Sequence, residues 1–253
     1  MTGDYLTNPQ AYDQLMARMT VDSYGNQALF DSIQRLQPKS ICEIGCGTGV
    51  ISQGMVSLAE RVMITDVDNV FLDYTQRKIG TDKAEYRIFD ATQDTLDEQV
   101  DLIVGRFVYH HISDDDKQRT LANLRRNITR QGAIVLLDYF LPHYDDESQK
   151  ASSVERFHRY RFSLFEGYPE LLMLEQQTYE LADDGEHKVC LRILVDQLAA
   201  ANLHLSEDML IRPDSIDDPD LFGMHLLVLK PAGIASDQFN SHNKNSSYNR
   251  IRS

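Results

Sequence analysis

The stretch ICEIGCGTGV, residues 41–50, says more about the fold of this chain than any other segment. An apolar run that includes Glu43 leads into three glycines at alternating positions, Gly45, Gly47 and Gly49. A short apolar run that stops at glycine is typical of a buried strand followed by a turn. Beyond the turn, apolar residues recur at helical spacing over 51–59, which predicts a helix. Because glycine has no Cβ, such a strand–turn–helix unit can bring backbone N–H groups close to a ligand.

The glycine spacing does not by itself choose that ligand. A dinucleotide-binding GxGxxG turn would need glycine or alanine where Val50 stands. A Walker phosphate loop would need GK[ST], which is absent. The GxGxG spacing therefore fits the dinucleotide motif poorly and leaves the ligand open.

Strands and helices are expected to alternate on either side of this loop. Apolar runs predict strands at 40–45, 61–68, 84–92, 100–111 and 130–140, the last after a turn at 130–132, with closing strands at 203–211 and 223–230. Helical spacing predicts helices at 28–36, 70–78 and 114–130. Near-continuously apolar strands that alternate with helices indicate a parallel sheet covered on both faces.

The helix predicted at 114–130 has signals at both ends. Ser113 is expected to cap its first turn, where three aspartates complement the helix dipole. Basic residues that complement the opposite end are expected in its last turn, namely Arg125, Arg126 and Arg130.

Three segments lie outside this alternation. Residues 1–37 are expected to form a helical N-terminal cap, and residues 142–202 a helical, aromatic-rich insert, both within one domain of residues 1–231. The final segment, residues 232–253, is polar and poor in apolar residues, which predicts a disordered tail.

The composition restricts the partners and the location. The net charge of −14 repels phosphate backbones, so we expect no nucleic-acid partner. No apolar run approaches a membrane span and the start does not resemble a signal peptide, so we expect no membrane partner. Three cysteines without a CxxC pair favour reduced thiols in a cytoplasmic protein, and we expect no metal. The oligomeric state, monomer or dimer, stays open.

Carboxylates at the ends of the next two strands narrow the choice of ligand. Asp66 ends the second strand, where a carboxylate can accept both hydroxyls of a ribose. Asp90 ends the third strand and could accept a hydrogen bond from an adenine amino group. Glu43 adds negative charge beside the glycines. Such an anionic site suits a cationic nucleoside better than a pyrophosphate, and S-adenosylmethionine is a ligand of that kind.

At this point the sequence resembles a known family. The motifs EIGCGTG (43–49), TDVD (65–68), FDAT (89–92) and VDLIVGRFVYHHI (100–112) are similar, in order and spacing, to class I S-adenosylmethionine-dependent methyltransferases. The segment RNITRQGAIVLLDYF (126–140) resembles the helix, turn and fifth strand of that family. The resemblance covers roughly residues 38–141 and 203–231. It departs from the family at RQG, where many members have PGG.

The resemblance implies an α/β fold, a Rossmann-like three-layer sandwich with a seven-stranded, mostly parallel sheet whose last strand, at 223–230, is antiparallel. It implies S-adenosylmethionine as the cofactor, with Gly45, Gly47 and Gly49 facing its methionine part and Glu43 as a further cofactor-binding residue beside the glycines. It implies that Asp66 holds the ribose and that the adenine lies against Val67, Asp90 and Ala91. At the end of the fourth strand it places two residues beside the methionine end and the substrate, Arg106 and Phe107.

The catalytic and substrate residues are hypotheses with open alternatives. His110 or His111, after the fourth strand, could deprotonate a methyl acceptor because histidine titrates near neutral pH. The alternative is a histidine that packs or starts a helix, since many members of the family have one at position 111 even where proximity alone is the mechanism. Tyr139, at the end of the fifth strand, is either a substrate contact or part of the core.

The insert at 142–202 lies where the family elaborates a lid. Its expected substrate contacts are Arg156, His158, Tyr160 and Arg161, of which at most three can point inward from one helix. The alternative is a solvated basic face. From the layout of the family, tyrosines of the N-terminal segment are expected to close over the cofactor, namely Tyr5, Tyr12 and Tyr24.

The sequence therefore predicts methyl transfer to oxygen or nitrogen of a small-molecule metabolite, possibly an intermediate of secondary metabolism. The absence of an NPPY-like motif after the fourth strand, where GRFVYHH stands, counts against methylation of adenine or glutamine amides. Two alternatives remain open. One is a protein of this fold that binds the cofactor but acts as a cyclase or non-methylating partner, and the other is an NAD oxidoreductase.

Overall fold

The computed structural model describes residues 7–16, 23–80, 82–180, 186–213 and 222–233. The predicted tail therefore lies outside the described residues from position 234 onward, as does Tyr5.

The described chain forms one seven-stranded sheet in the order β3-β2-β1-β4-β5-β7-β6. The first five strands are parallel, and β7 runs antiparallel to both of its neighbours. This confirms the predicted sheet and its antiparallel strand. The strands are β1 (Ser40–Ile44), β2 (Arg61–Asp66), β3 (Glu85–Ile88), β4 (Val100–Arg106), β5 (Ile128–Phe140), β6 (Leu203–Pro213) and β7 (Gly223–Pro231).

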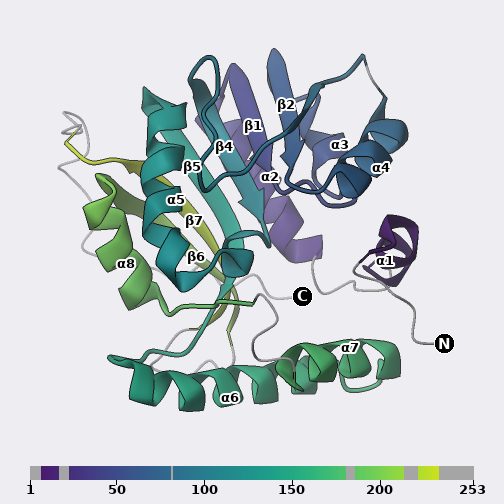
Figure 1. The fold of residues 1–253 in the computed structure, drawn as a ribbon, viewed down its shortest axis with the longest axis vertical. Helices are drawn as coiled ribbons and strands as arrows, with labels where there is room; N and C mark the ends of the chain where they lie inside the picture. Colours follow the sequence, from purple (N-terminus) through teal and green to yellow (C-terminus); the bar gives the residue numbers. More distant parts are fainter. Residues whose placement is uncertain (1–6, 17–22, 81, 181–185, 214–221, 234–253) are drawn as a thin grey trace.

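Helices cover both faces of the sheet, as Figure 1 shows. On one face lie α2 (Ser23–Leu36), α3 (Ser52–Met55) and α4 (Asn69–Ile79), and on the other lie α5 (Asp114–Asn127) and α8 (Leu191–Ala200). Successive side chains of a strand point to opposite faces of the sheet. Val135 therefore packs on the face that α2, α3 and α4 cover, and its neighbour Leu136 on the face that α5 and α8 cover. The parallel strands are apolar throughout because both faces are buried.

The first turn of α5 has the predicted signals, whereas its last turn has them only in part. The Ser113 hydroxyl accepts a hydrogen bond from the Asp116 N–H, and three aspartates occupy the first turn. Arg125 and Arg126 lie in the last turn, but the prediction for Arg130 is wrong because the chain enters β5 at Ile128. The predicted turn at 130–132 is also absent. Those residues belong to β5, whose register with β4 shifts between Val100 and Leu102.

Two other predicted elements are shorter than expected. The helix after the glycine turn, α3, has 4 residues, because the N–H groups of Glu60 and Arg61 both bond back to the carbonyl of Lys39 and the chain turns into β2. The third strand ends at Ile88 rather than Asp90. There the Asp90 N–H donates to the Asp94 carboxylate at 2.8 Å, which takes the backbone out of strand pairing.

Two helices stand beyond one end of the sheet, at the bottom of Figure 1. They are α6 (Glu147–Leu164) and α7 (Pro169–Glu180). The end they cover is the carboxyl edge of the parallel strands, since the Arg161 guanidinium of α6 lies 4.4 Å from the Tyr139 ring at the end of β5. The third helix of the predicted insert, α8, packs instead against α5 and β6. Of the three described helices of the insert, only α6 and α7 therefore lie where a lid would.

The N-terminal helices have different neighbours. Buried Leu29 and Ile33 of α2 belong to the core of the sheet. The first helix, α1 (Pro9–Met16), contacts α4, where Asp13 forms an ion pair with Lys78 at 2.8 Å and Tyr12 meets Phe71 edge to face. The side chain of Tyr24 is outside the described part of the chain.

Candidate active site

The glycine turn after β1 has the backbone conformation that its sequence requires. All three glycines have positive φ, with values of 64°, 52° and 74° at Gly45, Gly47 and Gly49. A Cβ at Gly45 would lie 2.6 Å from a methyl group of Val108, whereas a Cβ at Gly47 would have nothing within 4 Å. Gly45 is thus required by packing, while the backbone of Gly47 is open to the approach of a ligand.

Glu43 lies under this turn and is fully enclosed. Its carboxyl accepts a hydrogen bond from the Ser52 hydroxyl at 2.5 Å. Burial raises the pKa of Glu43 to about 8, although the Ser52 hydrogen bond acts in the opposite direction. At neutral pH the residue is therefore held largely in its neutral form, and a nearby cation would favour its ionisation.

Asp66 connects the end of β2 to the glycine turn. Its Oδ2 accepts from the Gly47 N–H at 2.9 Å and its Oδ1 from the Asp68 N–H at 3.0 Å. These two bonds fix the carboxylate but use only part of its acceptor capacity. The next residue, Val67, is 65% exposed, so an apolar surface lies beside the carboxylate. This pairing of acceptor and apolar surface suits a nucleoside.

Asp90 forms a local turn. Its Oδ1 accepts from the Thr92 N–H at 2.9 Å and its Oδ2 from the Gln93 amide at 2.8 Å. Burial opposes ionisation, but the hydrogen bonds from Thr92 outweigh it and lower the pKa of Asp90. The neighbouring carbonyl of Ala91 accepts from the Asn123 side chain at 3.1 Å. The structure therefore shows Asp90 in a turn-forming role. Its contact with adenine stays a prediction.

The end of β4 is lined by stacked side chains. Phe107 has a positive φ of 55° and stacks on Tyr139 with ring centroids 5.0 Å apart. The Arg106 guanidinium lies 4.2 Å from the Phe107 ring, and its Nε donates to Asn26 of α2 at 2.6 Å. Tyr139 is 6% exposed and belongs to the core cluster, so packing accounts for much of its surface.

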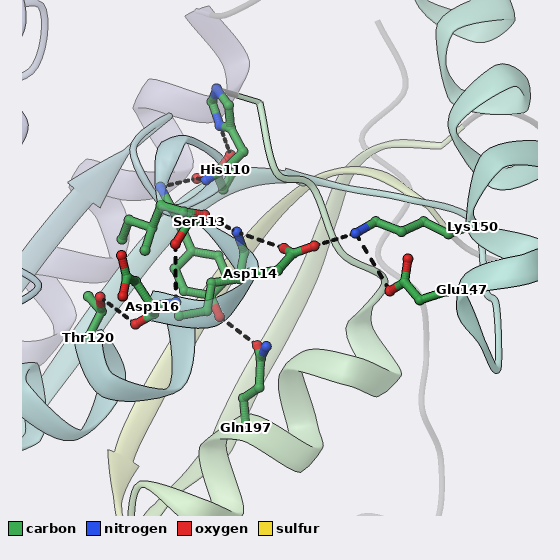
Figure 2. Close-up of polar contacts among 12 residues, drawn as sticks. His110, Ser113, Asp114, Asp116, Thr120, Glu147, Lys150 and Gln197 are labelled. Carbon is green, nitrogen blue, oxygen red and sulfur yellow. Dashed lines mark hydrogen bonds and ion pairs between the residues drawn. The ribbon is translucent and has the colours of Figure 1, made fainter. Parts of the chain in front are cut away.

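His110 and Asp138 form a buried pair that joins the ends of β4 and β5. His110 lies in the short helix η2 (Tyr109–His111; Figure 2). Its Nδ1 is 2.6 Å from Asp138 Oδ1. Asp138 also accepts from the N–H groups of Tyr109 at 2.7 Å and Tyr139 at 2.7 Å. Burial would raise the pKa of Asp138, but the charge of His110 and its hydrogen bond lower it below the usual value.

An ionised carboxylate can only accept, so His110 must donate from Nδ1 to Asp138. In a neutral imidazole the lone pair is then on Nε2, which is the arrangement of a general base oriented by a carboxylate. His111 differs, because it is exposed and its ring contacts that of His110, with the centroids 4.1 Å apart. Of the two predicted histidines, His110 is the one with the geometry of a base.

Comparisons with known proteins agree with this geometry. Residues 41–132 match the methyltransferase domain family, which covers the glycine turn, Asp66, Asp90 and η2. Over these residues the chain is similar to methyltransferases. An uncharacterized methyltransferase of Bacillus velezensis is 26% identical over 135 residues, 50% of this chain, and the match spans 61% of that protein's length.

Solved structures of methyltransferases share the fold of this chain. A TehB-like S-adenosylmethionine-dependent methyltransferase from Corynebacterium glutamicum superposes with a TM-score of 0.58 at 19% identity, covering 88% of this chain and 97% of the other. The DhpI protein, solved in complex with S-adenosylhomocysteine (SAH), has a TM-score of 0.55 at 16% identity, covering 92% and 99% of the two chains.

The predicted substrate residues fall into two groups on α6. His158 and Arg161 share one carboxylate of α7, with His158 Nδ1 2.9 Å from Glu175 Oε1 and Arg161 Nε 3.2 Å from Glu175 Oε2. Arg156 and Tyr160 instead contact the ring of Phe222, at 4.9 Å and 5.6 Å. The first group lies toward the carboxyl edge because Arg161 also stacks on Tyr139.

Sequence reasoning misses the roles of three polar residues of this region. The sequence predicts Asp138 near the end of the fifth strand, and that position is the only signal of a partner for His110. Glu175 has its pKa lowered to about 2, since the charge of Arg161 and the hydrogen bond from His158 outweigh its burial. Burial lowers the pKa of Lys188 to about 8. Neither Glu175 nor Lys188 belongs to a motif, so only the folding of α6, α7 and the segment before α8 brings them here.

Within the described ranges, no group of three or more His, Cys, Asp and Glu side chains could hold a metal ion. Among the described helices, none has the length and apolarity to cross a membrane. The three cysteines are free thiols and buried, which agrees with the prediction of reduced cysteines.

Proposed function

We propose that this protein transfers a methyl group from S-adenosylmethionine to oxygen or nitrogen of a small-molecule metabolite. His110 acts as the general base and Asp138 orients it. The observation that carries the proposal is the buried 2.6 Å pair of His110 and Asp138 at the same sheet edge as the glycine turn. A base is useful for hydroxyl, phenol or protonated amine acceptors, because these must lose a proton when they are methylated.

The residues at the carboxyl edge fit the cofactor. Asp66 would accept the ribose hydroxyls with its remaining lone pairs, and exposed Val67 would cover one face of the adenine, with Asp90 and Ala91 at its edge. Gly45, Gly47 and Gly49 would admit the methionine part, and Glu43 would face its positive charge. S-adenosylmethionine supplies a methyl group on a sulfonium, which is electrophilic without help from the protein.

The chain's own contribution is then to position the acceptor, to exclude water and to take a proton. Positioning by a closed site is worth several orders of magnitude in rate. We assign it to α6 and α7, whose Arg161 and His158 face the carboxyl edge from the lid side. Arg106 and Phe107 would form the opposite wall beside the methionine end.

A small molecule is favoured as acceptor over a macromolecule. The net charge of −14 disfavours a nucleic acid. In addition, α6 and α7 stand beyond the carboxyl edge, a position that would limit the room for a large acceptor (Figure 1). The alternative function is a protein that binds the cofactor but acts as a cyclase or non-methylating partner.

The decisive experiment incubates the purified protein with methyl-labelled S-adenosylmethionine and a panel of phenol, carboxylic acid and amine metabolites. Release of S-adenosylhomocysteine that depends on an acceptor supports methyl transfer. The variant His110→Asn should lower kcat roughly a hundredfold or more without weakening cofactor binding in calorimetry. Tight cofactor binding with no release for any acceptor would favour the non-methylating alternative, and binding of NAD instead would overturn both functions.

A further inference from the structure

The segment that carries His110 cannot hold its own position. It is a single turn of η2, whose internal hydrogen bonds run from His111 N–H to Val108 and from Ile112 N–H to Tyr109. A 3₁₀ turn of this length is weak in isolation. The position of the imidazole therefore depends on contacts from neighbouring elements, and one of these contacts comes from a lysine.

Lys117, in the first turns of α5, is 0% exposed. Its ammonium donates to the backbone carbonyl of Ile112, directly after η2, and lies 5.1 Å from the ring of Tyr109 within η2. It thus contacts the residues on both sides of the histidines. Lysine is almost never fully buried unless it is paired, so this placement calls for a specific reason.

The pair of Lys117 is Asp114, and Asp114 has a second partner in the lid. Lys117 Nζ is 3.4 Å from Asp114 Oδ1, and Asp114 Oδ2 bonds to the ammonium of Lys150. Lys150 belongs to the first turns of α6 and also lies 3.8 Å from Glu147. Figure 2 shows the side chains of Lys150, Glu147 and Asp114 meeting beside η2.

Burial lowers the pKa of Lys117 to about 8, while the charge of Asp114 acts in the opposite direction. Lys117 is therefore mostly charged at neutral pH, with Asp114 as its counter-ion. Asp114 in turn lies between two ammonium groups, one from α5 and one from α6. Lys117, Asp114 and Lys150 form a charge cluster that joins the lid helix to the segment of the base.

We propose that Lys117 is a positioning residue for His110, and that the Asp114–Lys150 ion pair makes this positioning depend on the lid helix α6. The proposal rests on the assignment of His110 as the base. Lys117 does not touch the reacting atoms. It holds the Ile112 carbonyl and the Tyr109 ring, so that the His110 ring stays in line with Asp138.

Two readouts report the position of His110 without any turnover. One is hydrogen–deuterium exchange of the backbone amides of residues 109–112, and the other is the tautomer of His110 seen by ¹⁵N NMR of labelled histidine. In Lys117→Met we expect exchange at 109–112 to rise about tenfold or more and the single Nδ1–H tautomer to be lost. We expect kcat to fall about tenfold or more, with the cofactor affinity unchanged.

A matched control lies one turn further along α5. Thr120 is also 0% exposed, and its hydroxyl donates to the Asp116 carbonyl at 2.9 Å. Thr120→Val perturbs the same buried face without a hydrogen bond to η2, so it should leave exchange at 109–112 and the tautomer unchanged. Equal changes in Thr120→Val and Lys117→Met would show a merely structural lysine and overturn the proposal. So would an unchanged tautomer in folded Lys117→Met.

The link to the lid is tested on α6, which also serves if Lys117→Met does not fold. Lys150→Met should raise exchange at 109–112 and lower kcat by about threefold to tenfold. Its control is Arg159→Gln, which removes another cation of α6 in an exposed pair with Glu155. Exchange at 109–112 that is the same in both variants and the wild type would overturn the link.

Failure of the base itself has a different signature. If His110→Asn retains the wild-type kcat, the proposed base is wrong, whatever Lys117 does. If His110→Asn is inactive but Lys117→Met keeps the wild-type kcat and tautomer, the base stands and the positioning role is overturned.

Discussion

The Nδ1 atom of His110 lies 2.6 Å from the Oδ1 atom of Asp138, across the ends of neighbouring strands β4 and β5. The two residues are 28 positions apart in the chain, and the pairing of β4 with β5 brings them together. Because Asp138 also holds the Tyr109 and Tyr139 N–H groups, it sets both the tautomer of the imidazole and the path of the backbone around it.

Asp138→Asn should lower kcat roughly a hundredfold or more, because an amide can donate to Nδ1 and would favour the wrong tautomer of His110. Cofactor affinity should stay the same, and the free energy of unfolding should fall by about 1–3 kcal/mol. Steady-state kinetics and urea unfolding measure both. The matched control is Asp208→Asn, which disrupts the His225–Asp208 pair of 2.7 Å on β7 and β6. A kcat that falls equally in both variants would contradict a specific role of Asp138.

Asp66→Ala should weaken binding of S-adenosylmethionine by about 2 kcal/mol, because it removes the acceptor proposed for the ribose hydroxyls. Isothermal titration calorimetry measures the change. Asp68→Ala is the control, since Asp68 caps α4 by accepting from the Val70 N–H at 2.7 Å. That variant should lose about 1 kcal/mol of stability and keep its cofactor affinity. Unchanged affinity in Asp66→Ala would show that the ribose assignment is wrong.

Glu43→Gln should change how stability depends on pH. The pKa of Glu43 is raised from 4.5 to about 8, so the folded state binds more protons than the unfolded state between these values. The stabilisation from the neutral form is present below pH 4.5 and is lost as pH rises through 8, at about 1.4 kcal/mol per pH unit at most. The substituted amide cannot ionise, so the variant should gain stability relative to the wild type as pH rises from about 5 to about 8.

Urea unfolding at several pH values measures this difference, with the exposed Glu60→Gln as a control. Parallel curves for wild type and Glu43→Gln would contradict the raised pKa. The same variant tests the contact with the cofactor. Wild-type protein should release close to one proton on binding S-adenosylmethionine at pH 7, seen by calorimetry in buffers of different ionisation enthalpy. Glu43→Gln should release none.

Gly47→Ala should separate folding from binding. A left-handed conformation costs alanine about 1–2 kcal/mol, but the added Cβ meets nothing within 4 Å in the protein. If Gly47 faces the methionine part of the cofactor, affinity should fall about tenfold or more, which is about 1.4 kcal/mol or more. Gly167→Ala is the control, because Gly167 also has a positive φ and open surroundings, between α6 and α7. Equal affinities in both variants would place the cofactor elsewhere.

Local sequence patterns are sufficient to predict the sheet and the glycine turn after β1. Buried parallel strands need apolar runs, and the turn after β1 needs glycine at positive φ. Asp66 is the last residue of β2, so the end of that apolar run is enough to locate it. A motif of this kind can be interpreted residue by residue because its geometry is set by neighbours in the chain.

Long-range packing, in contrast, decides which of the two histidines has the geometry of a base. It also decides which side chains of α6 and α7 contact each other. His110 and His111 are adjacent and alike in sequence, but η2 turns one toward Asp138 and leaves the other exposed. Glu175 gathers His158 and Arg161 because α6 and α7 pack against each other. The sequence likewise does not predict the burial of Lys117, because acidic residues fill the first turn of its helix and suggest a solvated face. Such contacts join residues far apart in the chain, so no local pattern or periodicity reports them.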